Sequence, residues 1–215
     1  HAVAAATAGA AITPSSIQIT PQTPYGSSGF KPIRAGEALL FGQRKGTLTN
    51  SARRLREATY SFDVDKYIAP NITILSEHIT GTGISSGAFV ADPDPVVWTV
   101  RTDGLLAALT YEAEQDVKGW SLHTLGGTSA VVERVAALPG ADGDELWLQV
   151  ARTIGGATVR YIEVLTTGLR DDTLKENAIY LDSALTYSGA STATITGLWH
   201  LEGQSVYALV DGSKQ

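Results

Sequence analysis

The chain of 215 residues contains no cysteine and no methionine, and only 18% of its residues are charged. Without cysteine it forms neither disulfides nor thiolate metal sites. The low charged fraction, combined with 43% hydrophobic residues, indicates a folded chain with a sizeable core. Because the sequence begins His1-Ala2-Val3 and has no initiating methionine, we expect it to be part of a longer protein.

An excess of basic residues is also missing. The chain has 16 Lys and Arg against 22 Asp and Glu, which gives a formal net charge of -6. Proteins that grip nucleic acid by its phosphates usually carry a basic excess, so the charge argues against ordinary DNA or RNA binding while leaving passive contact with DNA open. No run approaches the roughly 18 apolar residues of a membrane-spanning helix, and no membrane association is expected.

Composition changes along the chain predict three regions. Residues 1–30 are rich in Ala, Thr and Ser and contain three prolines, which indicates an irregular, extended lead-in or arm. Residues 31–190 alternate between apolar runs and turn residues and predict a partial β-propeller-like platform, with a long polar connection over 167–190. Residues 191–215 predict the start of a further β unit.

Apolar runs bounded by turn residues predict most of the strands. We expect strands at 37–43, 57–64, 96–101, 105–111, 117–123, 129–137, 145–152 and 157–165, the last of them buried on both sides. Asp103-Gly104 and Gly155-Gly156 are expected at the tips of two hairpins. A third hairpin is expected from residues 192–201 and 204–210.

One short helix is expected from Asn71 to Gly81. Asn71 is a good N-cap, Gly81 a good terminator, and Ile72, Leu75 and Ile79 would share one face.

The two clear hairpins resemble one another. Residues 98–104 (WTVRTDG) align loosely with 147–155 (WLQVARTIG), and their tryptophans are 49 residues apart. A period near 50 residues with several strands is typical of β-propeller blades. We therefore predict an all-β fold, a propeller-like arrangement of antiparallel β-sheets with one short helix. The large aromatic residues expected in its core are Trp98, Trp120, Trp147 and Tyr161.

Residues that could carry chemistry do not form a recognisable catalytic pattern. The four histidines, at positions 1, 78, 123 and 200, lack metal-ligand spacing. Residues 92–94 and 142–145 are acidic loops, and the second resembles an incomplete calcium loop, but a solvated turn is favoured over an ion site. Asp103, Glu112 and Glu114 could form a glycosidase-like carboxylate pair only if they faced one cleft. Accordingly, we expect no enzyme activity, no catalytic, cofactor-binding or metal-binding residue, and no cofactor.

The one basic cluster contains Arg53, Arg54 and Arg56. It can be a solvated or salt-bridged loop, a contact with an acidic subunit face, or a contact with DNA. A solvated or salt-bridged loop is the default interpretation, and a subunit contact is its best rival because the planar guanidinium binds a carboxylate through two parallel hydrogen bonds.

Several segments together are similar to tail proteins of short-tailed bacteriophages and prophages. The similarity extends over roughly residues 20–212 and is carried by residues 69–79, 97–112, 114–123, 144–163 and 197–212. In order and spacing they resemble the tail nozzle, or tail tubular protein B-like, family, whose members are also called DNA-stabilisation proteins.

This resemblance implies a structural role in the virion. Family members form a homo-oligomeric ring, expected to be a hexamer, which contacts other tail or adaptor proteins and surrounds packaged DNA that it retains or releases. The protein would be made in the bacterial host cytoplasm. Two other classes remain open: a receptor- or carbohydrate-binding tail adhesin, which solvent-exposed rings at Trp120 and Trp199 would favour, and a cell-wall or polysaccharide hydrolase.

Overall fold

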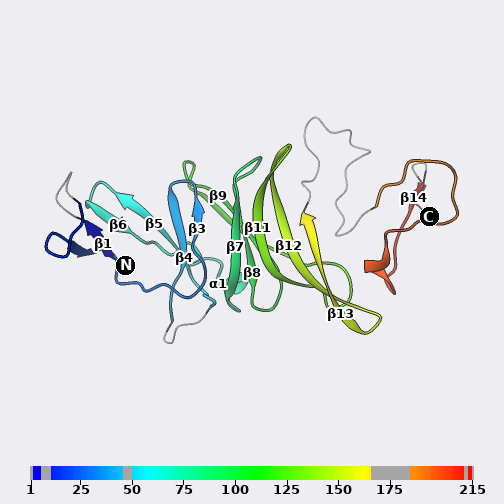
Figure 1. The fold of residues 1–215 in the computed structure, drawn as a ribbon, viewed down its shortest axis with the longest axis horizontal. Helices are drawn as coiled ribbons and strands as arrows, with labels where there is room; N and C mark the ends of the chain where they lie inside the picture. The colour runs from blue at the N-terminus through cyan, green and yellow to red at the C-terminus, as the bar shows by residue number, and fades with distance from the viewer. Residues whose placement is uncertain (1, 6–10, 46–49, 166–184, 211–212, 215) are drawn as a thin grey trace.

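The computed structural model describes residues 2–5, 11–45, 50–165, 185–210 and 213–214, and these form a mostly-β molecule (Figure 1). Most strands belong to three antiparallel sheets. The first sheet contains β3 (Ile33–Ala35), β4 (Ala38–Gly42), β5 (Leu55–Ser61) and β6 (Lys66–Ile68). The second contains β7 (Ile84–Val90), β8 (Val96–Arg101), β9 (Leu106–Glu112) and β10 (Val117–His123). The third contains β11 (Val131–Gly140), β12 (Gly143–Ile154) and β13 (Ala157–Leu165).

The remaining elements are short. β1 (Ala2–Ala5) pairs with β2 (Gln18–Pro21), and β14 (Leu209–Val210) pairs with β15 (Ser213–Lys214). The helix α1 (Glu77–Thr80) lies between the first and second sheets in the sequence, and a 3-10 turn, η2 (Trp199–Leu201), follows the third sheet. No helix of the described segments is long and apolar enough to cross a membrane.

Each of the three sheets is a meander, in which strands that follow one another in the sequence are neighbours in the sheet. Short turns make this possible. Thr102, Asp103 and Gly104 join β8 to β9, and Gly104 has φ +85°. Gly155 and Gly156 join β12 to β13, and both have positive φ, as a two-residue hairpin turn of type I′ requires. Both predicted hairpin tips are confirmed.

The sheets pack face to face around two hydrophobic cores. The first core joins the first and second sheets and includes Leu40, Leu55, Val97 and Leu109. The second core joins the second and third sheets and includes Val100, Leu106, Leu148 and Val150. Because side chains alternate along a strand, β8 sends Val97 into one core and Val100 into the other. The second sheet is therefore buried on both faces.

The first strands of the three sheets lie next to one another. β7 contacts both β3 and β11, and in Figure 1 these three strands occupy the middle of the molecule, with β6 and β13 toward opposite ends. Gly87 of β7 permits the close approach to β3, since a Cβ at that position would lie 2.5 Å from Cδ1 of Ile33. The three sheets are therefore in contact through their first strands, β3, β7 and β11.

The predicted strands agree with the structure except toward the C-terminus. β8, β10 and β13 have the expected bounds, and β4, β5, β9, β11 and β12 differ by a few residues at their ends. Strands β3, β6 and β7 were not expected, and residues 1–30, expected to be irregular, contribute β1 and β2. The predicted hairpin of residues 192–201 and 204–210 is wrong, because residues 185–208 contain no strand and residues 199–201 form η2. Most of the connection 167–190 lies outside the described residues.

The predicted helix is much shorter than expected. Asn71 does not cap it: its Oδ1 accepts hydrogen bonds from the backbone N and Oγ1 of Thr73, which fold residues 71–73 into a local turn. The helix begins only after Ser76, and Gly81 follows its end. Ile79 is buried, whereas Leu75 is exposed, so the expected apolar face does not form.

The predicted aromatic core is also wrong in detail. Trp98, Trp120, Trp147 and Tyr161 are all only partly buried. The fully buried positions belong mainly to aliphatic residues, which fill the narrow space between two sheets without a polar atom to satisfy. β13, expected to be buried on both sides, is mostly exposed.

Candidate functional site

A buried arginine ends the second strand of the second sheet. Arg101 is 8% exposed, and its Nε donates to Oδ1 of Asp103 at 3.0 Å while its Nη2 contacts Oδ2 of the same carboxylate. Its Nη1 donates to the backbone carbonyl of Ile79 at 2.7 Å. Arg101 therefore fixes both the β8–β9 turn and the segment that leads into the second sheet.

The third sheet repeats this arrangement. Arg152, near the end of β12, is 2% exposed and binds the carboxylate of Glu163 through Nε and Nη2, both at 2.8 Å. Its Nη1 donates to the carbonyl of Gly126. Ile79 precedes the first residue of β7 by five positions, and Gly126 precedes the first residue of β11 by the same number. Each arginine therefore binds the segment that leads into the first strand of its own sheet.

A backbone hydrogen bond repeats at the two junctions between sheets. The amide of Ile84, the first residue of β7, donates to the carbonyl of Ala52 at 2.7 Å. The amide of Val132 in β11 donates to the carbonyl of Gly104 at 2.8 Å. In each case the first strand of one sheet binds a residue two or three positions before the third strand of the preceding sheet. The same type of backbone contact thus joins the first sheet to the second and the second sheet to the third.

The two buried arginines give one alignment of the repeat. Arg101-Thr102-Asp103-Gly104 corresponds to Arg152-Thr153-Ile154-Gly155, an offset of 51 residues. At this offset Trp98 corresponds to Gln149. Trp98 packs against the second core, whereas Trp147 lies on the opposite face of β12 from Leu146 and Leu148. Both tryptophans are thus partly buried and lie on the corresponding side of their sheets, the side away from the preceding sheet, so the predicted equivalence is not contradicted.

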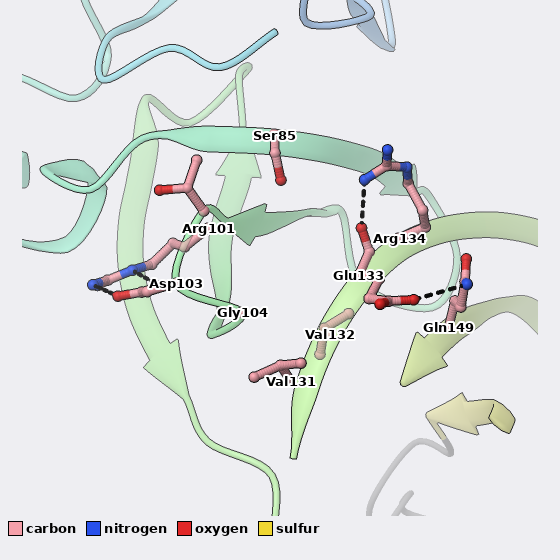
Figure 2. A pocket seen from close by; sticks show the side chains of 10 residues that line it. Ser85, Arg101, Asp103, Gly104, Val131, Val132, Glu133, Arg134 and Gln149 are labelled. Carbon is pink, nitrogen blue, oxygen red and sulfur yellow. Dashed lines mark hydrogen bonds and ion pairs between the residues drawn. The ribbon is translucent and has the colours of Figure 1, made fainter. Parts of the chain in front are cut away.

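A shallow hollow of about 570 Å³ lies where the second and third sheets meet, lined by Ser85, Arg101, Thr102, Asp103, Gly104, Val131, Val132, Glu133, Arg134 and Gln149 (Figure 2). The Glu133 carboxylate of this lining is paired: Gln149 Nε2 donates to it at 2.9 Å, and Arg160, from outside the hollow, binds it as well. The hydrogen bond from the Arg160 guanidinium lowers the pKa of Glu133. These side-chain bonds join strands of the third sheet, and the backbone hydrogen bond from Val132 to Gly104 crosses to the second sheet.

A second polar network crosses the junction between the first and second sheets. Glu57 of β5 accepts a hydrogen bond from the Tyr111 hydroxyl at 2.9 Å and pairs with Nζ of Lys118 at 2.9 Å. Burial, together with the bond to Glu57, raises the pKa of Tyr111. Burial opposes the charge of Lys118, but Glu57 and Asp116 outweigh it and raise the pKa of that amine. Three residues from different strands thus tie the two sheets together.

The candidate carboxylate pair does not form. Asp103 lies in the β8–β9 turn and binds Arg101, whereas Glu112 ends β9 and Glu114 lies in the following turn. These groups are therefore at opposite ends of a seven-residue strand. The structure gives them no common cleft in which one could act as an acid and the other as a base or nucleophile.

The two acidic loops meet. The amide of Asp144 donates to the carbonyl of Asp92 at 2.9 Å, and the amide of Ala91 donates to Oδ2 of Asp144 at 2.8 Å. These contacts pin the β7–β8 turn to the β11–β12 turn. Among the described residues, no group of three or more His, Asp or Glu side chains is arranged to hold a metal ion.

The histidines lie apart from one another. His78 is exposed on α1, the ring of His123 lies 5.1 Å from that of Trp98, and the ring of His200 lies 6.4 Å from that of Tyr161. His1 lies outside the described residues.

The three arginines of the basic cluster differ in burial. Arg53 is exposed, and Arg54 forms an exposed ion pair with Glu77 at 3.1 Å. Arg56 is buried, donates through Nε to Gln43, and stacks 3.3 Å above the ring centre of Tyr25. The salt-bridged reading is confirmed for Arg54. Because Arg56 is buried, the three arginines do not form one basic surface.

The two tryptophans that bear on sugar binding differ in exposure. Trp120 packs against the first core and donates from Nε1 to the carbonyl of Ile72 at 3.1 Å. Trp199 is 65% exposed. Only the second ring is free to stack on a ligand.

Sequence reasoning found the hairpins but missed the buried arginines that hold them. The available signal was the shared Arg-Thr pair at 101–102 and 152–153, which the tryptophan alignment obscured. Comparison with known proteins adds no assignment: no family model matches the chain, and no curated protein matches it.

Proposed function

We propose that the chain is a structural component of a bacteriophage tail, a nozzle or tubular protein that forms part of the DNA conduit and retains or releases packaged DNA. The observation that supports this best is the repeated junction between successive sheets, with its backbone hydrogen bond and buried arginine. Such a junction transmits force through packed sheets and paired charges. In addition, the resemblance of residues 20–212 to tail nozzle proteins supports a mechanical role.

The three sheets fit a propeller-like arrangement. Propeller blades are four-stranded antiparallel sheets set around a central axis. Here the first two sheets are four-stranded meanders, and the first strands β3, β7 and β11 lie next to one another. The described part of the chain then corresponds to an arc of blades whose inner strands face the axis.

The net charge of -6 fits a passive conduit, since a wall that repels phosphate lets DNA slide. We expect no binding of a short DNA duplex at physiological salt, measured by fluorescence anisotropy. Roughly micromolar binding that weakens steeply with added salt would contradict the passive contact. Arg53→Ala with Arg54→Ala would then identify the exposed basic residues as its source.

The tail role itself is tested on particles. Antibodies raised against the chain should label the tails of purified phage particles in electron microscopy, and particles that lack the protein should lose their DNA. Label confined to the unassembled fraction of the lysate would overturn the proposal.

A tail adhesin is the second candidate, and the exposed ring of Trp199 favours it. An adhesin should bind host polysaccharide, and Trp199→Ala should abolish that binding while Trp120→Phe leaves it unchanged. No retention on immobilised host polysaccharide would exclude this alternative.

A further inference from the structure

Exposed basic residues of the first sheet gather at one of its ends. The amide of Gln43 donates to the carbonyl of Arg54 at 2.8 Å, so the residues that leave β4 lie beside those that enter β5. The exposed cations at this end are Arg44, Lys45, Arg53 and Arg54. We name these four side chains the basic end of the first sheet. It does not include Arg56, which is buried.

Three of the four cations have no acidic partner in the described part of the chain. No ion pair there includes Arg44, Lys45 or Arg53. The fourth cation shows what such a group binds: Nε of Arg54 pairs with Oε1 of Glu77 at 3.1 Å, with both side chains about half exposed. The basic end therefore binds one carboxylate already and has three further cations available.

The opposite ends of the sheets are acidic. Ala52, just before β5, pairs with Ile84, the first residue of β7, so the β5–β6 and β7–β8 turns both lie away from the basic end. The β9–β10 turn lies with them because the second sheet is a meander, and the β11–β12 turn contacts the β7–β8 turn. Each of these four turns has an exposed carboxylate outside the ion pairs of the described residues, namely Asp63, Asp94, Glu114 and Asp142. Two exposed cations, Arg34 and Lys66, also lie near this end.

Distance separates the charges of the two ends. Strand β5 runs from one end to the other with seven residues, which at roughly 3.3 Å per residue span about 23 Å. Dissolved salt screens exposed charges over about 8 Å at physiological ionic strength. The acidic turns therefore do not cancel the attraction of the basic end for an anion, although the whole chain has a net charge of -6.

The small number of free cations decides which kind of anion fits. Proteins that hold duplex DNA tightly make many phosphate contacts, on the order of six to ten, and three free cations are too few for that. A short acidic segment of a protein needs only two or three partners. Arginine suits such a segment, because its planar guanidinium binds a carboxylate at two points.

We propose that the basic end of the first sheet binds an acidic segment of a partner protein. Arg44 and Arg53 pair with carboxylates of that segment, and Lys45 adds attraction beside them. The contact between Arg54 and Glu77 is the example of this recognition within the chain. The inference goes beyond the tail role proposed above and does not rest on it, so failure of one leaves the other standing.

Fluorescence anisotropy with a labelled peptide of glutamate residues tests the proposal on the full chain. Wild type should bind the peptide at low salt, and added salt should weaken the binding steeply. The basic-end variant, Arg44→Glu with Arg53→Glu, should bind at least about tenfold more weakly, because two attractions become repulsions. Both side chains are exposed, so far-UV circular dichroism should be unchanged. Arg44→Gln with Arg53→Gln repeats the test without added negative charge.

The matched control changes the net charge equally at the other end of the same sheet. Arg34→Glu with Lys66→Glu replaces two exposed cations near the acidic turns. Because these positions lie away from the basic end, this variant should bind the peptide nearly as well as wild type.

Three results would overturn the proposal. The first is wild type that does not bind the peptide even at low salt. The second is a control variant that loses as much affinity as the basic-end variant. The third is a short DNA duplex that binds more tightly than the peptide and is lost in the basic-end variant, which would make nucleic acid the partner.

Discussion

The second and third sheets are built alike but buried differently. Both begin with a strand whose amide binds the preceding sheet, and both have a buried arginine near the end of the second strand. Yet the second sheet lies between two cores, whereas the third packs on one side only. Leu109 of the second sheet is 0% exposed, and Ile162 of the third is 68% exposed.

This difference shows that the neighbouring sheet, and not the strand's own sequence, decides burial. The strand ATVRYIEVL (β13) contains as many β-branched and aromatic residues as the shorter strand VVWTVR (β8). β8 is covered on both faces because sheets lie on both sides of it. β13 is exposed because, within the described part of the chain, no sheet packs on its outer side.

Truncation of an aliphatic residue should give the largest difference in stability between the two sheets. Leu109→Ala should lower the free energy of unfolding by about 4 kcal/mol, because it leaves a cavity within the first core. Ile162→Ala should cost less than about 1 kcal/mol in the monomer, because the side chain is already in contact with water. Urea unfolding of monomeric protein measures both, and equal losses would contradict the comparison.

The paired turn glycines should give the next largest difference. Gly104→Ala should cost about 3 kcal/mol, because the methyl group would collide with Val131 and the backbone has φ +85°. Gly155→Ala should cost only about 1 kcal/mol, because its φ is +56° and the space beside it is open. Thermal unfolding of the two variants gives the comparison. A larger loss at Gly155 would show that the two turns are not equivalent.

Truncation of the two tryptophans should lower stability in the same order, more in the second sheet than in the third, but with a smaller difference. Trp98→Ala should cost about 2 kcal/mol, since the ring packs partly against the second core. Trp147→Ala should cost about 1 kcal/mol, because its ring lies on the side of β12 away from the second core and its Nε1 donates to Glu145, itself partly exposed. Chemical denaturation checks the order. A costlier Trp147→Ala would contradict the comparison between the two sheets.

The smallest effect concerns pH and the Arg101–Asp103 pair. The hydrogen bond from Arg101 lowers the pKa of Asp103 and outweighs the opposing effect of burial. A lowered pKa gives stability that is fully present above the unfolded value of about 4 and is lost as pH falls through the folded value. Asp103→Asn should therefore cost roughly 1 kcal/mol at neutral pH, a modest figure because the carboxylate is partly exposed.

The pH dependence supplies the control for that prediction. The difference between wild type and Asp103→Asn should shrink as pH falls below about 4, as measured by urea unfolding at several pH values. A difference that stays constant over this range would mean that the charge of Asp103 does not contribute.

The sequence predicts the hairpins well because their signals are local. Asp103-Gly104 and Gly155-Gly156 stand between apolar runs, and such turns need no distant partner to form. Strand β7 was missed because its sequence ISSGAFV has no clear alternation. Its small residues are explained only by the close approach of β3 at Gly87, which the sequence does not display.

The junction residues were harder to predict for a related reason. A buried arginine has the same sequence signature as an exposed one, and its partners at Ile79 and Gly126 are 22 and 26 residues away. Tryptophan seemed the natural landmark because large aromatic residues usually mark a core. In this fold the space between sheets is filled by aliphatic residues, so the arginines and glycines carry the repeat.

Amide hydrogen exchange tests the central claim, that one junction joins successive sheets twice. The amides of Ile84 and Val132 donate the two junction hydrogen bonds, and Thr124, in the loop before the third sheet, is an exposed reference. Both junction amides should exchange only through global unfolding, with similar protection, while Thr124 exchanges rapidly. Exchange of either Ile84 or Val132 at the rate of Thr124 would contradict the account.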